Sequence, residues 1–286
     1  MKVYIDGQIM DAADAKISVL DHGLLYGDGV FEGIRIYNGN VFKLREHVER
    51  LYMSAKALLL SIPMTQDEME KAILDTVAAT GQRDGYIRPI VTRGVGCLGI
   101  DPASCVKPSV IIIVGDIRLY PAEYYEQGMD IVTVPTRRIP SDSLDPRIKS
   151  LNYLNNIMAK LEARRAGCLE AVMLNHEGFV AECSADNIGI VRRGALSIPS
   201  AYNGALDGIT MQTVIELACG LNIPHQAASL TRYDLYNADE CFLTGTGAEI
   251  MPVTKIDGRV IGGGRPGPVT ARLRAAFTQR VSAGEA

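Results

Sequence analysis

The chain has 286 residues, of which 47% are hydrophobic and 22% are charged, and its formal net charge is −4. This length allows one large domain or two of moderate size, and the composition is ordinary for a soluble globular protein. The weakly negative charge and the lack of any Lys/Arg run give no basis for binding nucleic acid. No apolar stretch is long enough to cross a bilayer, and the alternating N-terminus lacks a signal-peptide core. We therefore expect a cytoplasmic protein with neither a membrane nor a nucleic-acid partner.

The first part of the chain is predicted to combine hairpin-linked strands with two helices. Asp6-Gly7 is a hairpin turn signal. KLREHVERLYMSAKALLLS has apolar residues at helical spacing, and Thr65 with Glu68 forms a capping box that opens a second helix, which ends before Gly81. A strand is expected over 30–37, and others over 86–92 and 109–115. These elements predict a small α+β domain at residues 1–116.

Residues 117–127 interrupt this pattern, because they contain a proline and show no clear period, and we predict that they link two domains. The second domain, residues 128–286, is predicted to begin with strands and a helix that runs from Lys149 to Arg165. Hairpins, a helix that starts near Ile209 and a C-terminal helix from about residue 267 follow. The predicted fold class is therefore α/β (α+β), in two domains.

Lys149 lies in RIKSLNYLNN, among aliphatic side chains and hydrogen-bonding amides. Only an unprotonated amine attacks a carbonyl, and apolar surroundings or a nearby positive charge such as Arg147 lower the pKa of a lysine. Lys149 is therefore a candidate nucleophile. The alternative, which this stretch taken alone favours, is an ordinary lysine at a helix start whose stem covers apolar surface.

Three further stretches carry groups that suit a cofactor. Gly208-Ile209-Thr210 opens a helix, and TGTGAEIMP (244–252) combines small residues with hydroxyls, so both can present backbone N–H groups to a phosphate. Glu182 ends an apolar strand, where a carboxylate can bind a protonated ring nitrogen. Each stretch also has a simpler explanation as a helix start, a tight turn or a capping carboxylate. Together with an amine, they match the aldehyde, phosphate and ring nitrogen of pyridoxal phosphate. The scattered cysteines and histidines predict no metal site.

Over almost its whole length, the chain closely resembles the branched-chain amino acid aminotransferases of the class IV (fold type IV) pyridoxal-phosphate enzymes. The motifs that carry the resemblance are YGDGVFEGIRIY, REHVERL, YIRP, RGVGCLGIDP, IKSLNYLNN, AVMLN, DNI, GIT, TGTGAEIMPV and GRPGPVT. The resemblance implies two domains with pyridoxal 5'-phosphate in the cleft between them, in a homodimer or higher homo-oligomer. It also implies transfer of the amino group of L-leucine, L-isoleucine or L-valine to 2-oxoglutarate.

The resemblance further implies cofactor-binding roles for single residues. Lys149 would hold the cofactor covalently and, once released by the substrate, would move a proton between substrate and cofactor. Glu182 would keep the pyridine nitrogen protonated. Tyr153 would hydrogen-bond the phenolic oxygen from the helical face that it shares with Lys149. Four residues would bind the phosphate: Arg50, Ile209 through its backbone N–H, Thr210 and Thr246.

The implied substrate site has a polar and an apolar part. Arg88 would receive the distal carboxylate of glutamate, with Arg35 supporting this region, although an ordinary salt bridge is the alternative for Arg88. The α-carboxylate would be bound by Tyr86, Thr246 and the backbone of Gly247. The branched side chain would contact Phe31, Tyr153 and, from a neighbouring subunit, Tyr26 and Ile100.

Two positions depart from the family pattern. Cys183 and Ala185 stand where glycines are common after the ring-nitrogen glutamate. Their Cβ atoms restrict positive φ and can crowd the cofactor, so we expect an effect on turnover and substrate range more than on the fold.

Three other functions fit parts of the same sequence. D-amino-acid aminotransferases share KSLN, but they place an Arg-x-His pair after the strand where this chain has RGVGCLGIDP without a histidine. 4-Amino-4-deoxychorismate lyase uses the same scaffold for an elimination. A non-enzymatic cofactor carrier is disfavoured, because carriage alone needs no Glu182 beside Lys149.

Overall fold

The computed structural model describes residues 1–117 and 119–284, and within them the chain divides into two compact units. The first unit holds residues 1–117 and Ile148–Asn152 and takes in the described residues from Val281 onward. The second holds residues 119–147 and Tyr153–Arg280. The predicted mixed α/β class is confirmed. The predicted boundaries stay a prediction, and the units differ from them in assigning Ile148–Asn152 to the first unit.

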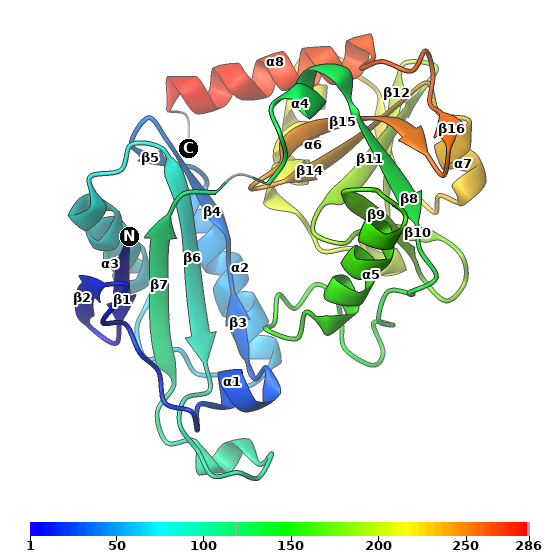
Figure 1. The fold of residues 1–286 in the computed structure, drawn as a ribbon. Coiled ribbons are helices and arrows are strands. Elements are labelled where there is room, and N and C mark those ends of the chain that lie inside the picture. The colour runs from blue at the N-terminus through cyan, green and yellow to red at the C-terminus, as the bar shows by residue number, and fades with distance from the viewer. Residues whose placement is uncertain (118, 285–286) are drawn as a thin grey trace. The chain divides into compact units, whose positions relative to one another are not determined.

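The first unit is an antiparallel sheet that carries two helices on one face (Figure 1). Within the described residues it has seven strands, in the order β2-β1-β7-β6-β4-β5, with β3 paired to β6. The strands are β1 (Lys2–Ile5), β2 (Gln8–Asp11), β3 (Gly29–Phe31), β4 (Ile34–Tyr37), β5 (Asn40–Val41), β6 (Gly85–Thr92) and β7 (Ser109–Gly115). The helices are α1 (His22–Tyr26), α2 (Leu44–Ala57), α3 (Gln66–Thr80) and a 3₁₀ turn (Pro102–Ser104).

Local sequence signals set the helix ends of the first unit. Glu68 N–H donates to the Thr65 hydroxyl at 3.2 Å, and the Glu68 carboxylate accepts from Thr65 N–H at 2.7 Å. This is the predicted capping box, which satisfies two backbone donors of the first turn of α3. Gly81, with φ 67°, ends the helix in the left-handed region. The strand predicted over 30–37 is instead divided between β3 and β4.

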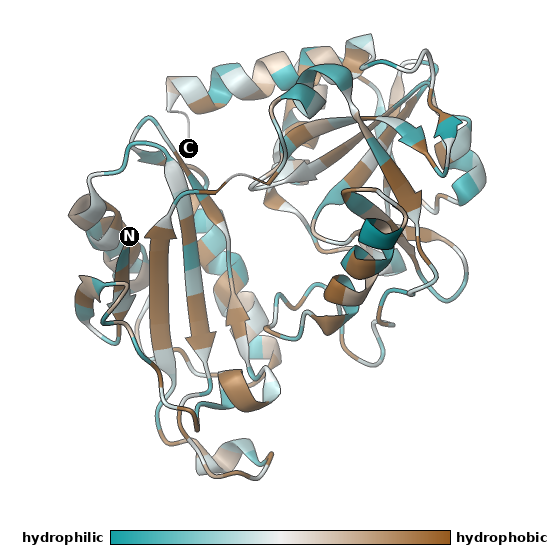
Figure 2. Cartoon of the chain, viewed as in Figure 1, coloured by the Kyte–Doolittle hydropathy of each residue, from teal (hydrophilic) through white to brown (hydrophobic). Residues whose placement is uncertain are grey.

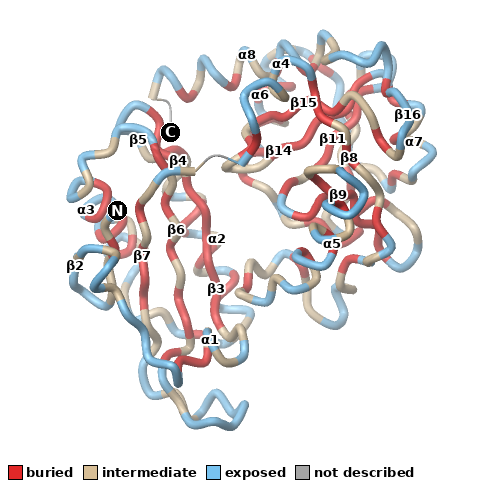
Figure 3. The backbone as a smooth tube through the Cα atoms, viewed as in Figure 1, coloured by how far each residue is buried: buried red, intermediate tan, exposed pale blue. Residues whose placement is uncertain are grey.

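Side chains alternate between the two faces of β6. Ile87 and Val91 are fully buried in a core with residues of α2 and α3, whereas the side chains at 86, 88 and 90 lie on the opposite face and stay partly exposed. Figure 2 shows the apolar stretch of the neighbouring strand β7 in brown, and Figure 3 shows buried residues running along these strands. The helix-covered face therefore builds the core, and the other face is left for polar side chains.

The second unit is a mixed sheet. Within the described residues it has nine strands, in the order β10-β9-β8-β15-β14-β11-β12-β13, with β16 paired to β15. The strands are β8 (Met129–Thr133), β9 (Glu170–Leu174), β10 (Val180–Cys183), β11 (Asn187–Arg192), β12 (Ala195–Pro199), β13 (His225–Ala228), β14 (Glu240–Gly245), β15 (Glu249–Ile256) and β16 (Arg259–Val260). The remaining elements are α4 (Glu123–Gln127), α5 (Leu154–Arg165), a 3₁₀ turn (Ala201–Asn203), α6 (Ile209–Gly220), α7 (Arg232–Tyr236) and α8 (Pro268–Ala283).

Two segments differ from the sequence-based expectation. The helix predicted from Lys149 begins only at Leu154, because the backbone before it pairs with β3 instead of continuing a helix. Part of the predicted linker forms the short helix α4, which packs on β15. No helix in the described part of the chain is both long enough and apolar enough to span a membrane.

Candidate active site

Backbone hydrogen bonds hold Lys149 against the first unit. The Lys149 carbonyl accepts from Phe31 N–H at 3.0 Å, and Leu151 N–H donates to the Gly29 carbonyl at 2.9 Å. Lys149 N–H donates to the Ser54 hydroxyl on α2 at 3.2 Å. The predicted shared helical face of Lys149 and Tyr153 is therefore wrong, since Lys149 pairs with a strand and Tyr153 is the N-cap residue of α5 in the second unit.

The side chains of Lys149 and Arg88 both contact the ring of Phe31. The Lys149 Nζ lies 4.8 Å from the ring centroid, and the guanidinium carbon of Arg88 lies 4.6 Å from it. Such contacts are favourable because the ring face carries partial negative charge. Arg88 also donates to the Tyr86 hydroxyl at 2.9 Å. Its buried Nε has no hydrogen-bond partner among the described residues, which leaves a donor for an anion.

The register of the sheet adds Arg35 to this face. Arg35 lies directly opposite Tyr86 in the β4–β6 pair, and its guanidinium lies 5.0 Å from the Tyr37 ring centroid. A Cβ at Gly33 would overlap with the Tyr86 hydroxyl, so this position accepts only glycine without a shift of the ring. The face thus gathers the amine of Lys149, two arginines, a phenol and an aromatic ring.

Glu32, the residue after Phe31, is a fully buried carboxylate. Arg50 donates to it from Nε at 2.6 Å and from Nη2 at 2.9 Å, and the ring Nδ1 of His47 lies 2.8 Å from it. Burial opposes ionisation of Glu32, but Arg50 and His47 outweigh it and hold the pKa of this carboxyl well below its usual range. Burial lowers the pKa of His47, so at neutral pH its Nδ1–H donates to Glu32. The phosphate contact predicted for Arg50 stays a prediction.

The second unit holds a matching buried carboxylate, Glu182, on β10. Its Oε1 pairs with Arg138 Nη2 at 2.9 Å, and its Oε2 accepts from Leu206 N–H at 2.8 Å. Arg138 Nη1 donates in turn to Asn156 Oδ1 at 2.9 Å. Both members of the ion pair are at least nine-tenths buried, so the charges compensate each other away from water. These contacts fix the direction of the Glu182 carboxylate, which binding a protonated ring nitrogen requires.

The start of α6 and the β14–β15 turn supply groups suited to a phosphate. No side chain caps the start of α6 at Gly208, which leaves backbone N–H groups of Ile209 and Thr210 available. A Cβ at Gly208 would overlap with Asn187 Oδ1, so the backbone approaches closely there. The Thr244 hydroxyl is buried without a hydrogen-bond partner among the described residues. Thr246 and Gly247 follow it in the turn between β14 and β15.

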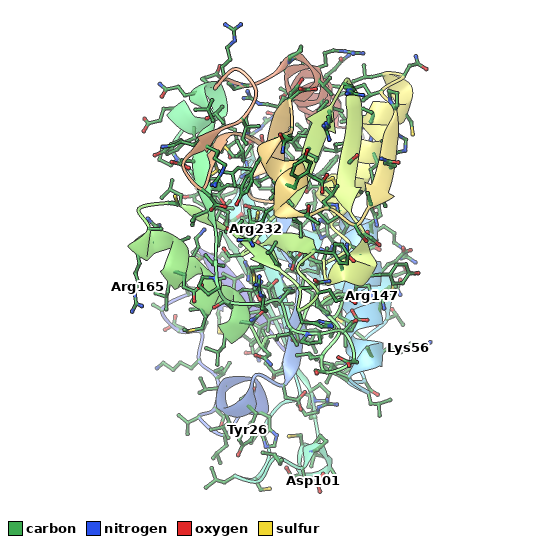
Figure 4. The ribbon with its side chains drawn as sticks, turned by 90° about the vertical axis from the view of Figure 1, so that its right-hand side faces the viewer. Tyr26, Lys56, Asp101, Arg147, Arg165 and Arg232 are labelled. Carbon is green, nitrogen blue, oxygen red and sulfur yellow. The ribbon has the colours of Figure 1, made fainter. Side chains whose placement is uncertain are left out.

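Tyr26 and Ile100 lie together at one end of the first unit. The Tyr26 hydroxyl donates to the Leu98 carbonyl, which anchors the segment that carries Ile100. Figure 4 shows Tyr26 on α1 at the same end as Asp101, the residue after Ile100. Ile100 is 81% exposed and Leu98 is 73% exposed, so this end presents apolar side chains to its surroundings.

The structure brings four predicted residues together in the first unit: Phe31, Tyr86, Arg88 and Lys149. It places six others in the second unit: Tyr153, Glu182, Ile209, Thr210, Thr246 and Gly247. Sequence reasoning missed Glu32, His47 and Arg138. A glutamate inside the apolar run VFEGI and a histidine on the buried side of α2 were signals for the first two, whereas no local pattern marks Arg138.

Comparison with known proteins gives a consistent result. The family model for amino-transferase class IV matches residues 29–256. The putative branched-chain-amino-acid aminotransferase of Methanocaldococcus jannaschii is 50% identical over 277 residues, which cover 97% of this chain and 95% of that protein. The crystal structure of the Escherichia coli branched-chain amino acid aminotransferase has a TM-score of 0.96 and 36% identity, covering 99% of this chain and 95% of that one. The branched-chain amino acid aminotransferase from Thermobaculum terrenum, solved in its PLP-form, has a TM-score of 0.90 and 31% identity, covering 99% of this chain and 94% of that one.

Substitution Glu32→Gln tests the buried cluster. We expect a loss of about 3–5 kcal/mol in the free energy of unfolding at neutral pH, because the charge of Arg50 loses its partner. The folded-state pKa of Glu32 is depressed, so its contribution is present above the ordinary carboxyl pKa and is lost as pH falls. Urea unfolding at several pH values measures the difference, which should shrink in acid. The exposed Glu49→Gln serves as control, with an expected change below about 1 kcal/mol.

Proposed function

Because the chain belongs to the amino-transferase class IV family, we propose that it moves the amino group of L-leucine, L-isoleucine or L-valine to 2-oxoglutarate, giving the branched-chain 2-oxo acid and L-glutamate. It is a pyridoxal-phosphate-dependent branched-chain aminotransferase: similar proteins carry the branched-chain aminotransferase name, and the one from Thermobaculum terrenum was solved in its PLP-form. The observation that carries the proposal is the amine of Lys149 held beside Arg88 over one aromatic ring. That the enzyme works in the cytoplasm remains a prediction from the sequence.

The residues assigned to the cofactor fit pyridoxal phosphate by their chemistry. Bound pyridoxal phosphate supplies an aldehyde that condenses with amines and a ring that withdraws electrons. Lys149 offers the amine, and Glu182, aligned by its ion pair with Arg138, offers the acceptor for the ring N–H. The uncapped start of α6 at Ile209 and Thr210 offers donors for the phosphate.

Lys149 also has a role as a base. Once released by the substrate amine, Lys149 Nζ would take a proton from the substrate α-carbon and pass it on to the cofactor. The contact of Nζ with the Phe31 ring and the backbone bonds of Lys149 keep this amine in one place between the two steps. A fixed position matters because proton transfer requires hydrogen-bond distance to the carbon.

Arg88 and the face of β6 suit a substrate site that accepts two kinds of side chain. The apolar ring of Phe31 can pack against a branched aliphatic chain. Arg88, whose buried Nε is unpaired within the described residues and which also bonds to Tyr86, can bind the distal carboxylate of glutamate. One pocket can then serve both half-reactions.

Exposed apolar residues near Tyr26 support the proposal of a homodimer or higher homo-oligomer. Val19, Leu24, Leu98, Ile100 and Val106 are all more than half exposed. Apolar side chains gathered at one end of a unit are typical of an interface. We infer that this end meets a second copy of the chain, to whose substrate pocket Tyr26 and Ile100 contribute.

Assays with three donors separate the candidate reactions. The holoenzyme with L-leucine and 2-oxoglutarate should form L-glutamate. D-Glutamate from D-alanine would identify a D-amino-acid aminotransferase, and pyruvate from aminodeoxychorismate would identify a lyase.

Lys149→Ala should reduce L-glutamate formation by at least about 100-fold and abolish the borohydride-reducible adduct at this residue. The exposed Lys71→Ala should change neither, and an unaffected Lys149→Ala enzyme would contradict the role of Lys149.

Arg88→Gln should separate the two substrates. We expect kcat/KM for L-glutamate to fall about 10- to 100-fold, because a charged hydrogen bond to the distal carboxylate is lost. For L-leucine, which has no such carboxylate, the fall should be within about threefold. Steady-state kinetics on both substrates, with the exposed Arg83→Gln as control, measure the ratio. Equal losses would show that Arg88 only supports the fold.

Sedimentation velocity tests the inferred interface. The wild-type protein should sediment as a dimer or a larger assembly at micromolar concentration. Ile100→Asp should shift it toward the monomer, since burying an unpaired charge in an interface is costly. An assembly unaffected by Ile100→Asp would place the interface elsewhere on the molecule.

A further inference from the structure

Three buried side chains of the second unit share one hydroxyl group. Tyr120 is 6% exposed, Glu170 is fully buried and Asp186 is 4% exposed. The Tyr120 hydroxyl lies 2.7 Å from Asp186 Oδ2 and 3.0 Å from Glu170 Oε2. A phenol carries one proton and can donate to only one of these oxygens. The other contact is therefore a hydrogen bond only if that carboxyl is itself protonated and donates to the phenol oxygen.

The surrounding donors decide which carboxyl holds the extra proton. Glu170 accepts from Lys160 Nζ at 2.8 Å, from Ala171 N–H at 2.7 Å, from Ser184 N–H at 2.9 Å and from the Ser184 hydroxyl. These donors occupy both oxygens of Glu170 as acceptors. For Asp186, Tyr120 is the only side-chain partner within the described residues. The consistent arrangement is that Asp186 donates to Tyr120 and Tyr120 donates to Glu170.

The charges around Asp186 favour the same arrangement. The carboxylates of Glu170 and Glu182 face it, and the cation that faces it, Lys160, is already bonded to Glu170. Burial, together with the charge of Glu170, raises the pKa of Asp186 to about 7. Burial likewise raises the pKa values of the Tyr120 phenol and of the neighbouring Cys183 thiol, so both stay neutral.

Asp186 lies in the turn that follows the ring-nitrogen carboxylate. Its carbonyl accepts from Cys183 N–H at 2.8 Å, which closes the turn after Glu182. A Cβ at Gly245 would overlap with Asp186 Oδ1, so the carboxyl also packs against the end of β14, next to Thr246. The neutral carboxyl thus lies between the two segments that we assign to the cofactor ring and its phosphate.

Hydrogen bonds connect the same turn to Glu182 itself. Asn156 donates to the Ser184 carbonyl at 2.8 Å and accepts from Arg138, which pairs with Glu182. Ser184 in turn donates to Glu170. A shift of the turn would therefore be felt at Glu182 through a continuous set of bonds.

We propose that Asp186 is a positioning residue that acts in its protonated form, donating to Tyr120 and so holding the turn that directs Glu182 toward the cofactor ring. This rests on the proposed function, because the direction of Glu182 matters for catalysis only when a pyridine ring is bound to it. Ionised Asp186 would add a negative charge beside Glu170 and Glu182, and the turn would shift away from them.

The raised pKa of Asp186 also links folding to pH. Between the ordinary carboxyl pKa and about 7, the folded state keeps the proton of Asp186, whereas the unfolded state has released it. The resulting stability is present in acid and is lost as pH rises through about 7.

Infrared spectroscopy detects the proton directly and needs neither substrate nor cofactor. The wild-type protein at about pH 6 should show the C=O band of a protonated, buried carboxyl, and this band should be missing from Asp186→Asn. The band should disappear from the wild-type spectrum as pH rises to about 9. Identical spectra for the two proteins in this region would overturn the proposal.

Thermal unfolding of the cofactor-free protein gives a second test. Between about pH 5 and about pH 8 the melting temperature of the wild type should fall by about 5 °C more than that of Asp186→Asn, whose amide donates to Tyr120 at every pH. The matched control is Tyr236→Phe, because Tyr236 donates to a single carboxylate, Asp257, and should leave the pH dependence unchanged. An Asp186→Asn protein with the wild-type pH dependence would contradict the proposal.

The pH profile of the holoenzyme then tests positioning. kcat for L-leucine should fall above about pH 7 in the wild type and stay level to higher pH in Asp186→Asn. Asp186→Ala, which cannot donate, should be slowed at every pH by about tenfold, and Asp186→Asn should restore the rate. Equal rates for Asp186→Ala and the wild type would show that the bond positions nothing. A wild type that does not transaminate L-leucine would refute the proposed function, while the infrared and unfolding tests would still decide the proton on Asp186.

Discussion

The two-residue alternation along β6 is the constraint on which the amine half of the site depends. One set of its side chains, including Ile87 and Val91, completes the core beneath α2 and α3. The other set, including Tyr86 and Arg88, must then lie on the opposite face. A shift of one residue in the pairing with β7 would exchange the two sets, exposing the core residues and burying an arginine. The stability of the core therefore also holds the proposed substrate-binding groups in register.

Buried charge is handled in the same way in both units. Glu32 and Glu182 are each compensated by an arginine and by a further donor, which is the arrangement that makes an interior carboxylate tolerable. The compensation restricts the direction of each carboxylate and, for Glu32, holds the pKa below its usual range. Tyr120 and Asp186 extend this network with neutral groups, so the second unit limits its buried charge near Glu182 by retaining a proton. The groups that compensate these buried carboxylates lie far from them in the sequence.

Local signals predicted the elements that depend on local interactions. The capping box at Thr65 and the start of α6 near Ile209 are set by residues within one helical turn, and both are confirmed. The helix expected from Lys149 failed because the backbone there pairs with β3, more than a hundred residues earlier in the chain. Arg138 was missed for a similar reason, since only the fold brings it to Glu182. The family motifs identified the chemistry, but the partners that align it are contributed by tertiary contacts.

The assignment of Ile148–Asn152 to the first unit has a consequence for how the protein can be divided. A fragment that ended at Ile117 would lack the segment whose backbone bonds with Gly29 and Phe31, and it would also lack Lys149, the proposed nucleophile. A fragment that began after Ile117 would carry that segment with no β3 to receive it. Neither half of the gene therefore encodes a self-sufficient module. Recombination between related enzymes would have to exchange residues 1–117 and Ile148–Asn152 together. Exchange of whole chains is therefore favoured over exchange of single contiguous segments.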